Sequence, residues 1–318
     1  MALKLLMMGT GAFALPSFKS IIASPHDVVG LVTQPDKTGR GHHRHFNVMK
    51  AEAEAAGIPV FQPENANATE SILQLREFGA DLFVVAAYGQ ILSSDLIEIP
   101  RLGAINLHGS LLPKYRGAAP IQYAVWNGES ETGVTIFQIE PKLDAGTILG
   151  KVASPIAGDD TSGTVHDRLA ELAGPLAIRI IDEIEAGTVS REPQDPHLVT
   201  KAPKLRKDQG LIDWTKTARE VDCQIRAMQP WPMPFTFLSI PGKPPIRIFV
   251  LKVAACLEQR LAPGELRAIG DEHLVVGTGD SALEIVTLQP AGKRPMPAAD
   301  FLRGTSVDGA FLTHREQG

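Results

Sequence analysis

The chain has 318 residues, 44% of them hydrophobic and 21% charged, which is typical of a globular protein and unlike a disordered chain. The net charge of −5 excludes a uniformly basic nucleic-acid binder, and no apolar run approaches the ~20 residues that a membrane span needs. Residues 1–203 carry 16 basic and 23 acidic side chains, and residues 204–318 carry 15 and 13, so the second part suits a phosphate backbone better. The two cysteines form no metal or disulfide pattern, which favours the reducing cytoplasm.

Apolar strands alternate with helices in the first part of the chain. The expected strands are 3–8, 28–33, 81–87, 103–107 and 133–139, and the expected helices are 12–23, 48–56, 69–78, 120–126 and 162–186. This alternation predicts an α/β domain with a mostly parallel sheet that is covered by helices on both faces.

The character of the sequence changes at residues 190–207, where three prolines lie among charged residues. Such a segment is typical of a linker between domains. Beyond it, a helix is expected at 215–228, and β-rich runs separated by Gly and Pro follow at 246–253, 273–277 and 282–288. The pattern predicts a small β-barrel or sandwich. We therefore expect domains at 1–189 and 208–318, joined by the linker 190–207.

The first strand leads into Gly9, Gly11 and Ala14, a spacing that resembles a dinucleotide-binding fingerprint. Such a site needs an acidic residue at the end of the second strand, where this sequence has Gln34, and Asp36 follows only in the next loop. A tight strand-to-helix turn with close packing explains the glycines equally well. The missing acid favours the turn.

Residues 38–45 read Thr, Gly, Arg, Gly, His, His, Arg, His. Three neighbouring histidines suggest a metal, but no Cys, Asp or Glu lies among them, and the two arginines repel a cation. We therefore expect no metal. A basic loop flanked by glycines suits contact with phosphate, and a mobile surface loop is the alternative.

The densest chemistry follows the strand at 103–107. Asn106 and His108 are two residues apart, so both side chains point to the same side of an extended chain, near the edge where open α/β sheets bind ligands. An amide donor and an imidazole there could hold one oxygen atom. Asp144 precedes a turn of small residues, and it either tunes the protonation of His108 or serves as a turn aspartate.

Asn106, His108, the Ser-Leu-Leu-Pro run at 110–113 and Asp144 resemble the active-site pattern of the folate-dependent formyltransferases. Several further segments closely resemble the branch of that family that acts on methionyl-tRNA, namely 34–36, 87–92, 116–122, 131–134, 231–233 and 288–293. The resemblance runs from about Leu5 to Asp300. It implies a Rossmann-like formyltransferase domain followed by an OB-like C-terminal β-barrel that binds tRNA.

The resemblance also implies the reaction: the formyl group of 10-formyltetrahydrofolate passes to the α-amine of initiator methionyl-tRNA for translation initiation. Asn106 and His108 would hydrogen-bond the oxygen of a tetrahedral intermediate, and His108 could donate a proton. Asp144 would orient His108, favour its charged form and help to take the proton of the amine. The sequence has no serine or cysteine triad signature, and direct attack by the amine needs no such nucleophile.

Two sets of binding residues follow from the resemblance. The folate is expected against Tyr88, Gly89, Gln90, Ile91, Leu92, Ser110, Leu111, Leu112 and Pro113, although the leucines also fit an ordinary core. The tRNA is expected at Arg40, His42, His43, Arg44, Lys204, Arg206 and Lys207. In this family the loop is usually rich in Lys and Arg, so its histidines predict that tRNA affinity rises as the pH falls.

Three other functions remain open at this point. The same chemistry on a small amine, such as an amino-sugar nucleotide, is disfavoured by the basic loop and the second domain. A Rossmann-type oxidoreductase is disfavoured by the missing acid, so we expect no NAD. A tRNA-binding module without catalysis is disfavoured by the intact set of Asn106, His108 and Asp144. We expect a cytoplasmic monomer that does not bind membranes.

Overall fold

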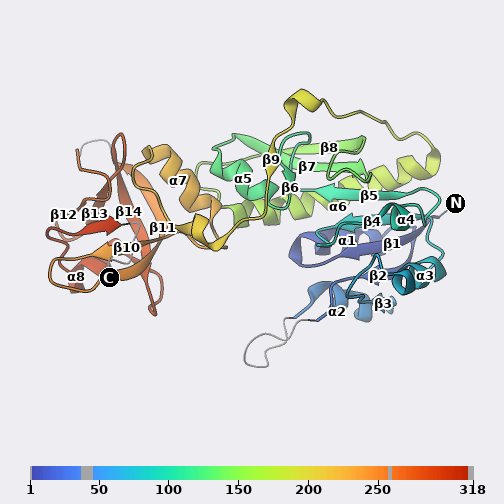
Figure 1. Ribbon diagram of the computed structural model, residues 1–318, viewed down its shortest axis with the longest axis horizontal. Coiled ribbons are helices and arrows are strands. Elements are labelled where there is room, and N and C mark those ends of the chain that lie inside the picture. The colour runs from blue at the N-terminus through green and yellow to red at the C-terminus, as the bar shows by residue number, and fades with distance from the viewer. Residues whose placement is uncertain (1, 37–45, 257–259, 314–318) are drawn as a thin grey trace. The chain divides into compact units, whose positions relative to one another are not determined.

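The computed structural model describes residues 2–36, 46–256 and 260–313. The chain divides into two compact units, which are described separately (Figure 1). The first unit comprises Met1–Pro120, Glu131–Pro155 and Val165–Pro203, and the second comprises Ile121–Ser130, Ile156–Thr164 and Lys204–Gly318. Within the described residues, no helix combines the length and the apolar character that crossing a membrane requires.

A seven-stranded sheet with the order β3-β2-β1-β4-β5-β7-β8 forms the centre of the first unit. Its strands are β1 (Lys4–Gly9), β2 (Asp27–Val32), β3 (Val60–Phe61), β4 (Leu82–Ala86), β5 (Ala104–His108), β7 (Glu131–Gln138) and β8 (Ile148–Pro155). The first five are parallel in a Rossmann-like order, and β7 and β8 are antiparallel. The expected α/β domain with a mostly parallel sheet is confirmed.

Helices lie against this sheet (Figure 1). They are α1 (Leu15–Ile22), α2 (Val48–Ala55), α3 (Thr69–Glu77), α4 (Ser94–Ile97) and α6 (Ser162–Ala186), with short 3-10 turns η1 (Ala12–Ala14) and η2 (Pro196–Leu198). The longest, α6, buries Leu169, Ala173, Ala177 and Ile180 at helical spacing. On β1, Leu5 to Met8 are all buried, as expected of a central strand with both faces covered.

The antiparallel edge of the sheet differs from the sequence expectation, which did not include β8. Only residues 139–147 separate β7 from β8. A parallel neighbour would need a crossover of a dozen or more residues, so a connection this short forces an antiparallel hairpin. The carboxyl end of β7 therefore leads directly into the turn that carries Asp144.

The glycine-containing turn after β1 is tightly packed. A Cβ on Gly9 would lie 3.0 Å from both the Ala14 Cβ and the Ala86 carbonyl oxygen. At the end of β2, the Gln34 amide donates a hydrogen bond from Nε2 to the Tyr88 carbonyl at 3.0 Å. These contacts account for the glycine pattern as a close strand-to-helix turn.

The second unit contains a nearly closed antiparallel barrel with the strand order β12-β13-β14-β11-β10-β16, and a bridge between Glu265 and Phe311 joins its ends. Its strands are β10 (Phe235–Ser239), β11 (Ile246–Cys256), β12 (Leu266–Ile269), β13 (His273–Gly277), β14 (Ala282–Pro290), β15 (Met296–Pro297) and β16 (Phe311–Thr313). The unit also holds α5 (Pro120–Trp126) from Ile121 on, η3 (Lys207–Gly210), α7 (Ala218–Ala227) and α8 (Ala298–Gly304). A barrel is confirmed over a sandwich.

The segment expected as a linker is attached to the first unit for most of its length. Strand β9 (Lys201–Ala202) pairs in parallel with β6 (Arg116–Gly117). The backbone of Glu192 exchanges two hydrogen bonds with that of Ile148. The domain boundaries at 189 and 208 stay a prediction. The structure shows in addition that parts of the segment between them pair with the first unit.

The barrel core offers a direct test of its packing. Trp214 is 1% exposed, and its Nε1 donates a hydrogen bond to the Thr236 Oγ1 at 3.1 Å. We expect Trp214→Ala to lower the free energy of unfolding of this unit by about 3–5 kcal/mol, because it leaves a cavity and removes the hydrogen bond that Thr236 Oγ1 accepts. Denaturant unfolding followed by circular dichroism measures the change. Trp231→Ala is the matched control, since Trp231 is 47% exposed, and an equal loss in both variants would contradict the prediction.

Candidate active site

An open pocket of about 110 Å³ lies at the carboxyl end of β5. Its lining brings together two of the predicted catalytic residues, Asn106 and Asp144, with part of the predicted folate loop. The lining residues are Val85, Gln90, Ile91, Leu92, Asn106, Phe137, Ile139, Glu140, Pro141, Leu143 and Asp144. Within the described part of the chain, the Asn106 amide has no hydrogen-bond partner. The pocket therefore offers a free amide beside a carboxylate, between apolar walls.

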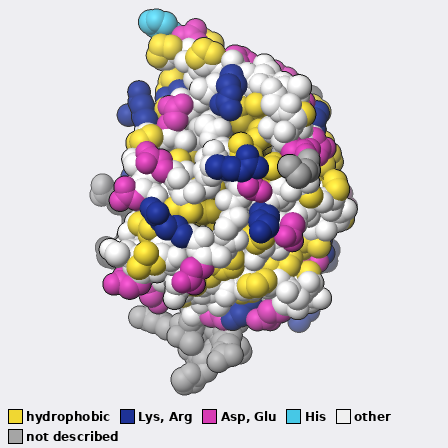
Figure 2. Space-filling model, turned by 90° about the vertical axis from the view of Figure 1, so that its right-hand side faces the viewer, with side chains coloured by type: hydrophobic (Ala, Val, Ile, Leu, Met, Phe, Trp, Pro, Cys, Tyr) yellow, Lys and Arg dark blue, Asp and Glu magenta, His cyan; other side chains and the backbone are white. Residues whose placement is uncertain are grey.

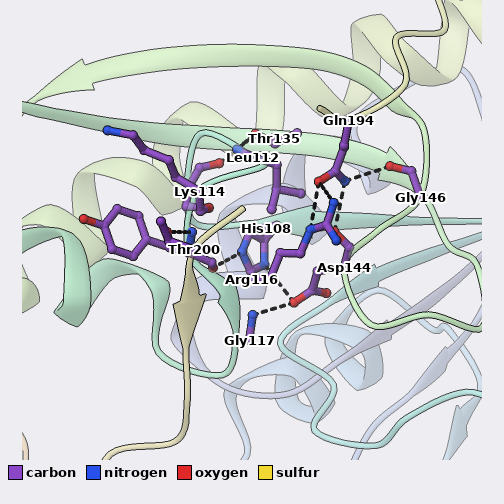
Figure 3. A network of polar contacts seen from close by, with 12 residues as sticks. His108, Leu112, Lys114, Arg116, Gly117, Thr135, Asp144, Gly146, Gln194 and Thr200 are labelled. Atoms are coloured by element: carbon purple, nitrogen blue, oxygen red, sulfur yellow. Dashed lines mark hydrogen bonds and ion pairs between the residues drawn. The ribbon is translucent and has the colours of Figure 1, made fainter. Parts of the chain in front are cut away.

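His108 lies behind this pocket and is 5% exposed. Its ring packs edge-on against Phe137, with the ring centroids 6.3 Å apart, and Phe137 lines the pocket. Its Nε2 lies 2.9 Å from the Tyr115 carbonyl oxygen, which can only accept, so Nε2 carries the proton. In the neutral ring, Nδ1 is therefore the free base, and it faces Asp144 at 3.9 Å (Figure 3).

This geometry corrects one expectation about Asp144. The hydrogen bond that orients the ring is the one that Nε2 donates to the Tyr115 carbonyl oxygen. The 3.9 Å between Nδ1 and Asp144 Oδ2 is too long for a hydrogen bond. The charge of Asp144 does favour imidazolium, as expected, but burial of the ring opposes it more strongly. Burial thus lowers the pKa of His108 below its ordinary 6.5, and the charge of Asp144 and the bond to Tyr115 raise it in part.

Asp144 is held in place by partners that the sequence did not reveal. It adopts a left-handed backbone conformation with φ 48°, and its Oδ2 accepts a hydrogen bond from the Gly117 amide at 2.8 Å. The Gln194 Nε2 donates to the carbonyl oxygens of Asp144 at 2.9 Å and Gly146 at 2.8 Å. The Gln194 Oε1 in turn accepts from Arg116 Nε and Nη2 at 3.0 and 2.6 Å (Figure 3). One amide therefore ties the Asp144 turn to the chain at 116–117.

The Ser110–Pro113 run forms a buried turn rather than an open wall. The Ser110 Oγ donates to the Lys114 carbonyl at 2.7 Å, and the Thr135 Oγ1 donates to the Ser110 carbonyl at 2.7 Å. Leu112 is 1% exposed and packs in the core against Phe137, while Leu111 and Pro113 are half-buried. None of the four lines the pocket as described, and their binding role stays a prediction.

The predicted folate loop divides between the pocket and its support. Ile91 is 73% exposed and Leu92 is in the core, and both line the pocket. Gln90 also lines it, although its Oε1 accepts from the Ala66 amide at 2.9 Å. Tyr88 is buried, and burial raises its pKa to about 12. Gly89 makes the bend, with φ 86°.

The predicted tRNA residues are partly outside the described residues: this holds for Arg40, His42, His43 and Arg44. Lys204, Arg206 and Lys207 are exposed at the start of the second unit. The Arg206 guanidinium pairs with Asp208 at 3.1 Å, and this contact holds the pKa of Asp208 below its usual range. Figure 2 shows a face on which basic and acidic side chains are interspersed without a large cluster of one sign.

Two supporting residues escaped the sequence analysis. Gln194 lies in a proline-rich segment without periodicity, so nothing local signalled its contact with a turn 50 residues earlier. Thr135 lies within an expected strand, and its hydroxyl is engaged only because β7 pairs with β5. No group of three or more His, Cys, Asp or Glu residues suited to a metal occurs in the ranges that the structure describes.

Solved structures of other proteins share this fold. Among solved structures, the chain is similar to WlaRD, a sugar 3N-formyl transferase, with 19% identity over 92% of this chain and 100% of that one and a TM-score of 0.66. An N-formyltransferase from Helicobacter canadensis matches with 20% identity over 91% and 99% and a TM-score of 0.66. HypX from Aquifex aeolicus matches with 17% identity over 99% of this chain and 51% of that one and a TM-score of 0.60. At these identities the structures show a shared fold.

The fold is thus the one found in formyl-transferring enzymes. A family model described as formyl transferase matches residues 3–181, and one described as the C-terminal domain of formyl transferase matches residues 204–306. The chain belongs to the formyl transferase family.

The support of Asp144 by Gln194 can be tested in the formyl-transfer reaction. Gln194→Ala removes the bridge and leaves the Arg116 guanidinium and two carbonyls without it, so we expect the Asp144 turn to shift and kcat to fall by roughly 10- to 100-fold. Steady-state kinetics measures the loss. Gln74→Ala, on the exposed side of α3, is the control, and equal activity of the two variants would rule out the role.

The lowered pKa of His108 also predicts how stability depends on pH. Because the folded protein holds this proton less tightly than the unfolded chain, the wild type loses stability as the pH falls below about 6.5. His108→Gln lacks this dependence, so the stability difference between wild type and variant should shrink between pH 7.5 and 5.5. Denaturant unfolding at both pH values measures it, with the exposed His197→Gln as control. A constant difference would contradict the prediction.

Proposed function

We propose that this protein transfers the formyl group of 10-formyltetrahydrofolate to the α-amine of initiator methionyl-tRNA. The observation that carries the proposal is one open pocket lined by Asn106 and Asp144, with the Nδ1 of the buried His108 3.9 Å from the Asp144 carboxylate. A free amide donor, a neutral buried imidazole and a fixed carboxylate are the groups that formyl transfer to an amine requires.

The pocket suits a folate donor by its chemistry. Apolar Ile91 and Leu92 line the same pocket as the polar Asn106, a combination that matches a ligand with flat ring faces and a reactive carbonyl. The three similar structures described above contain a folate: WlaRD was solved with 5-N-formyl-THF, the Helicobacter canadensis enzyme with folinic acid, and HypX in complex with tetrahydrofolic acid. When bound, 10-formyltetrahydrofolate supplies the formyl group. No metal is required.

Asn106, His108 and Asp144 each have a different role in the reaction. The Asn106 side chain donates a hydrogen bond to the formyl oxygen, which gains negative charge as the amine attacks. The His108 Nδ1 is the free base in the neutral ring and takes a proton that the amine releases. Asp144, at 3.9 Å from Nδ1, stabilises the imidazolium that results. The imidazolium then returns this proton to the donor nitrogen as the bond between that nitrogen and the formyl carbon breaks, so that tetrahydrofolate leaves. Since the base must begin neutral, the low pKa of His108 serves this step.

Initiator methionyl-tRNA is the acceptor favoured by the sequence. The resemblance to the branch that acts on this tRNA extends through residues 231–233 and 288–293, which lie in the barrel unit. The basic residues Lys204, Arg206 and Lys207 precede the barrel, with Arg206 partly neutralised by Asp208. A barrel of this kind is a frequent nucleic-acid-binding fold.

An amine on a nucleotide-linked sugar is the second candidate acceptor. The N-formyltransferase from Helicobacter canadensis was solved with folinic acid and dTDP-3-aminofucose, and the match covers nearly all of both chains. Both acceptors present a primary amine to the same kind of pocket.

Formyl transfer from 10-formyltetrahydrofolate to charged initiator tRNA tests the proposal. We expect the wild type to formylate methionyl-tRNA, and Asn106→Ala and His108→Ala to lose about 10²–10³ in rate, since each removes a group that acts in the transition state. His197→Ala, an exposed histidine of the same unit, should retain full activity. Transfer to a dTDP-linked amino sugar without transfer to tRNA would overturn the acceptor and leave the chemistry.

A further inference from the structure

The outer face of β10 and β11 differs from an ordinary solvated sheet. On β10, Thr236 and Leu238 point into the barrel and are fully buried, and Ile248 and Val250 do the same on β11. The alternate positions therefore form the outer face. Phe235 pairs there with Phe249, and Phe237 with Arg247. We call these four residues the Arg247 surface. Its three rings are half-buried, and Arg247 is exposed.

Arg247 is held by rings instead of by a carboxylate. Its guanidinium carbon lies 3.7 Å from the Phe235 ring centroid and 5.0 Å from that of Phe249. Phe237 supports Phe235 edge-on, with centroids 6.0 Å apart. No acidic side chain pairs with Arg247 among the residues that the structure describes. Because rings leave the N–H groups unused, the guanidinium keeps its charge and its donors for an external partner.

The stretches of chain beside Arg247 contain no acid to compete for it, and the one carboxylate of β14, Glu284, pairs with His273 at 2.8 Å. Residues 223–256, which include β10 and β11, hold no Asp or Glu, and residues 285–299 on the neighbouring β14 and its turn hold none either. The backbone amide of Ala291 donates to the Arg247 carbonyl, which brings that turn beside Arg247. Exposed basic residues in these segments are Lys243, Lys252, Lys293 and Arg294.

One carboxylate lies on the adjoining segment, which bridges to Phe235 at Leu211. This is Asp213, and its Oδ1 accepts hydrogen bonds from the Thr215 amide at 3.0 Å and from the Thr215 hydroxyl at 2.6 Å. It is thus engaged within its own turn. The net charge of the Arg247 surface and its surroundings therefore remains positive.

We propose that the Arg247 surface binds RNA, with Arg247 contacting a backbone phosphate and its guanidinium plane stacking on an unpaired base. The inference rests on the proposed function, because it takes the tRNA acceptor as the partner. The surplus of positive charge on this surface favours an anionic ligand. The planar guanidinium, which lies over the Phe235 and Phe249 rings, favours a ligand that also has a flat group to stack on it. RNA joins both properties in one strand. A second copy of the chain, with its net charge of −5, offers carboxylates and separate exposed rings such as Trp231, but not a repeating pair of phosphate and base in one strand.

Binding of uncharged initiator tRNA between 50 and 200 mM salt tests the inference. We expect Arg247→Ala to weaken binding about tenfold and to reduce the slope of log affinity against log salt by about one, since one phosphate contact is lost. Arg247→Lys should keep the slope and lose part of the affinity, because it preserves the charge and loses the planar group.

Arg267→Ala is the matched control. Arg267 is an exposed arginine of the same barrel, but it pairs with Glu265 at 3.2 Å. It should change affinity less than twofold, and thermal unfolding should show that both variants fold. Equal affinity of Arg247→Ala and Arg267→Ala would overturn the inference, as would dissociation of a wild-type dimer by Arg247→Ala with unchanged RNA binding.

Formyl transfer to methionyl-tRNA in the same samples separates this inference from the proposed function. If the surface acts in binding alone, Arg247→Ala raises KM for tRNA and leaves kcat unchanged. A wild type that transfers to tRNA while Arg247→Ala behaves as Arg267→Ala refutes the surface only. A wild type that binds tRNA through Arg247 but transfers nothing to it refutes the acceptor only.

Discussion

The hydrogen bond from His108 Nε2 to the Tyr115 carbonyl decides how the site can work. It assigns the proton of the neutral ring to Nε2, so that the basic nitrogen faces Asp144. Burial of the ring favours its neutral form, and the charge of the nearby carboxylate favours its protonated form. Burial alone would lower the pKa of His108 further, whereas the nearby carboxylate alone would raise it. The site combines the two by burying the ring and placing the Asp144 carboxylate 3.9 Å from Nδ1, without a direct hydrogen bond.

The carboxylate depends on parts of the chain that are far apart in sequence. Gly117 donates to its oxygen, and Gln194 holds the backbone of its turn. Gly146 completes the turn in a position where a Cβ would lie 1.7 Å from the Gln138 carbonyl oxygen, so only glycine fits there. Strands β6 and β9 align the segments that carry Gly117 and Gln194. The position of Asp144 is therefore a property of the folded unit and not of its own loop.

The sequence predicted what periodicity and local chemistry encode. The helix at 162–186 was predicted with its observed bounds, and β1, β4 and β5 within two residues, because buried strands and long amphipathic helices leave strong patterns. Short strands such as β10 and β16 were missed, since a run of three to five residues is too short to show a distinctive period in the sequence. Asn106, His108 and Asp144 were selected by residue type and by resemblance. The partners of His108 were beyond reach, because a backbone carbonyl such as that of Tyr115 has no sequence signature.

The attachment of residues 190–203 changes what counts as the smallest piece of chain able to carry this site. The central sheet and its longest helix are complete at Ala186, and a fragment ending there would contain Asn106, His108 and Asp144. It would lack Gln194, and also Thr200, whose hydroxyl accepts from the Tyr115 amide at 2.8 Å. Tyr115, whose carbonyl fixes the tautomer of His108, would lose its hydrogen bond to Thr200. The turn that carries Asp144 would lose its hydrogen bonds to Gln194. A truncation that keeps the whole sheet would thus still disrupt the site. The smallest fragment that contains the site and its supporting contacts extends at least to Thr200.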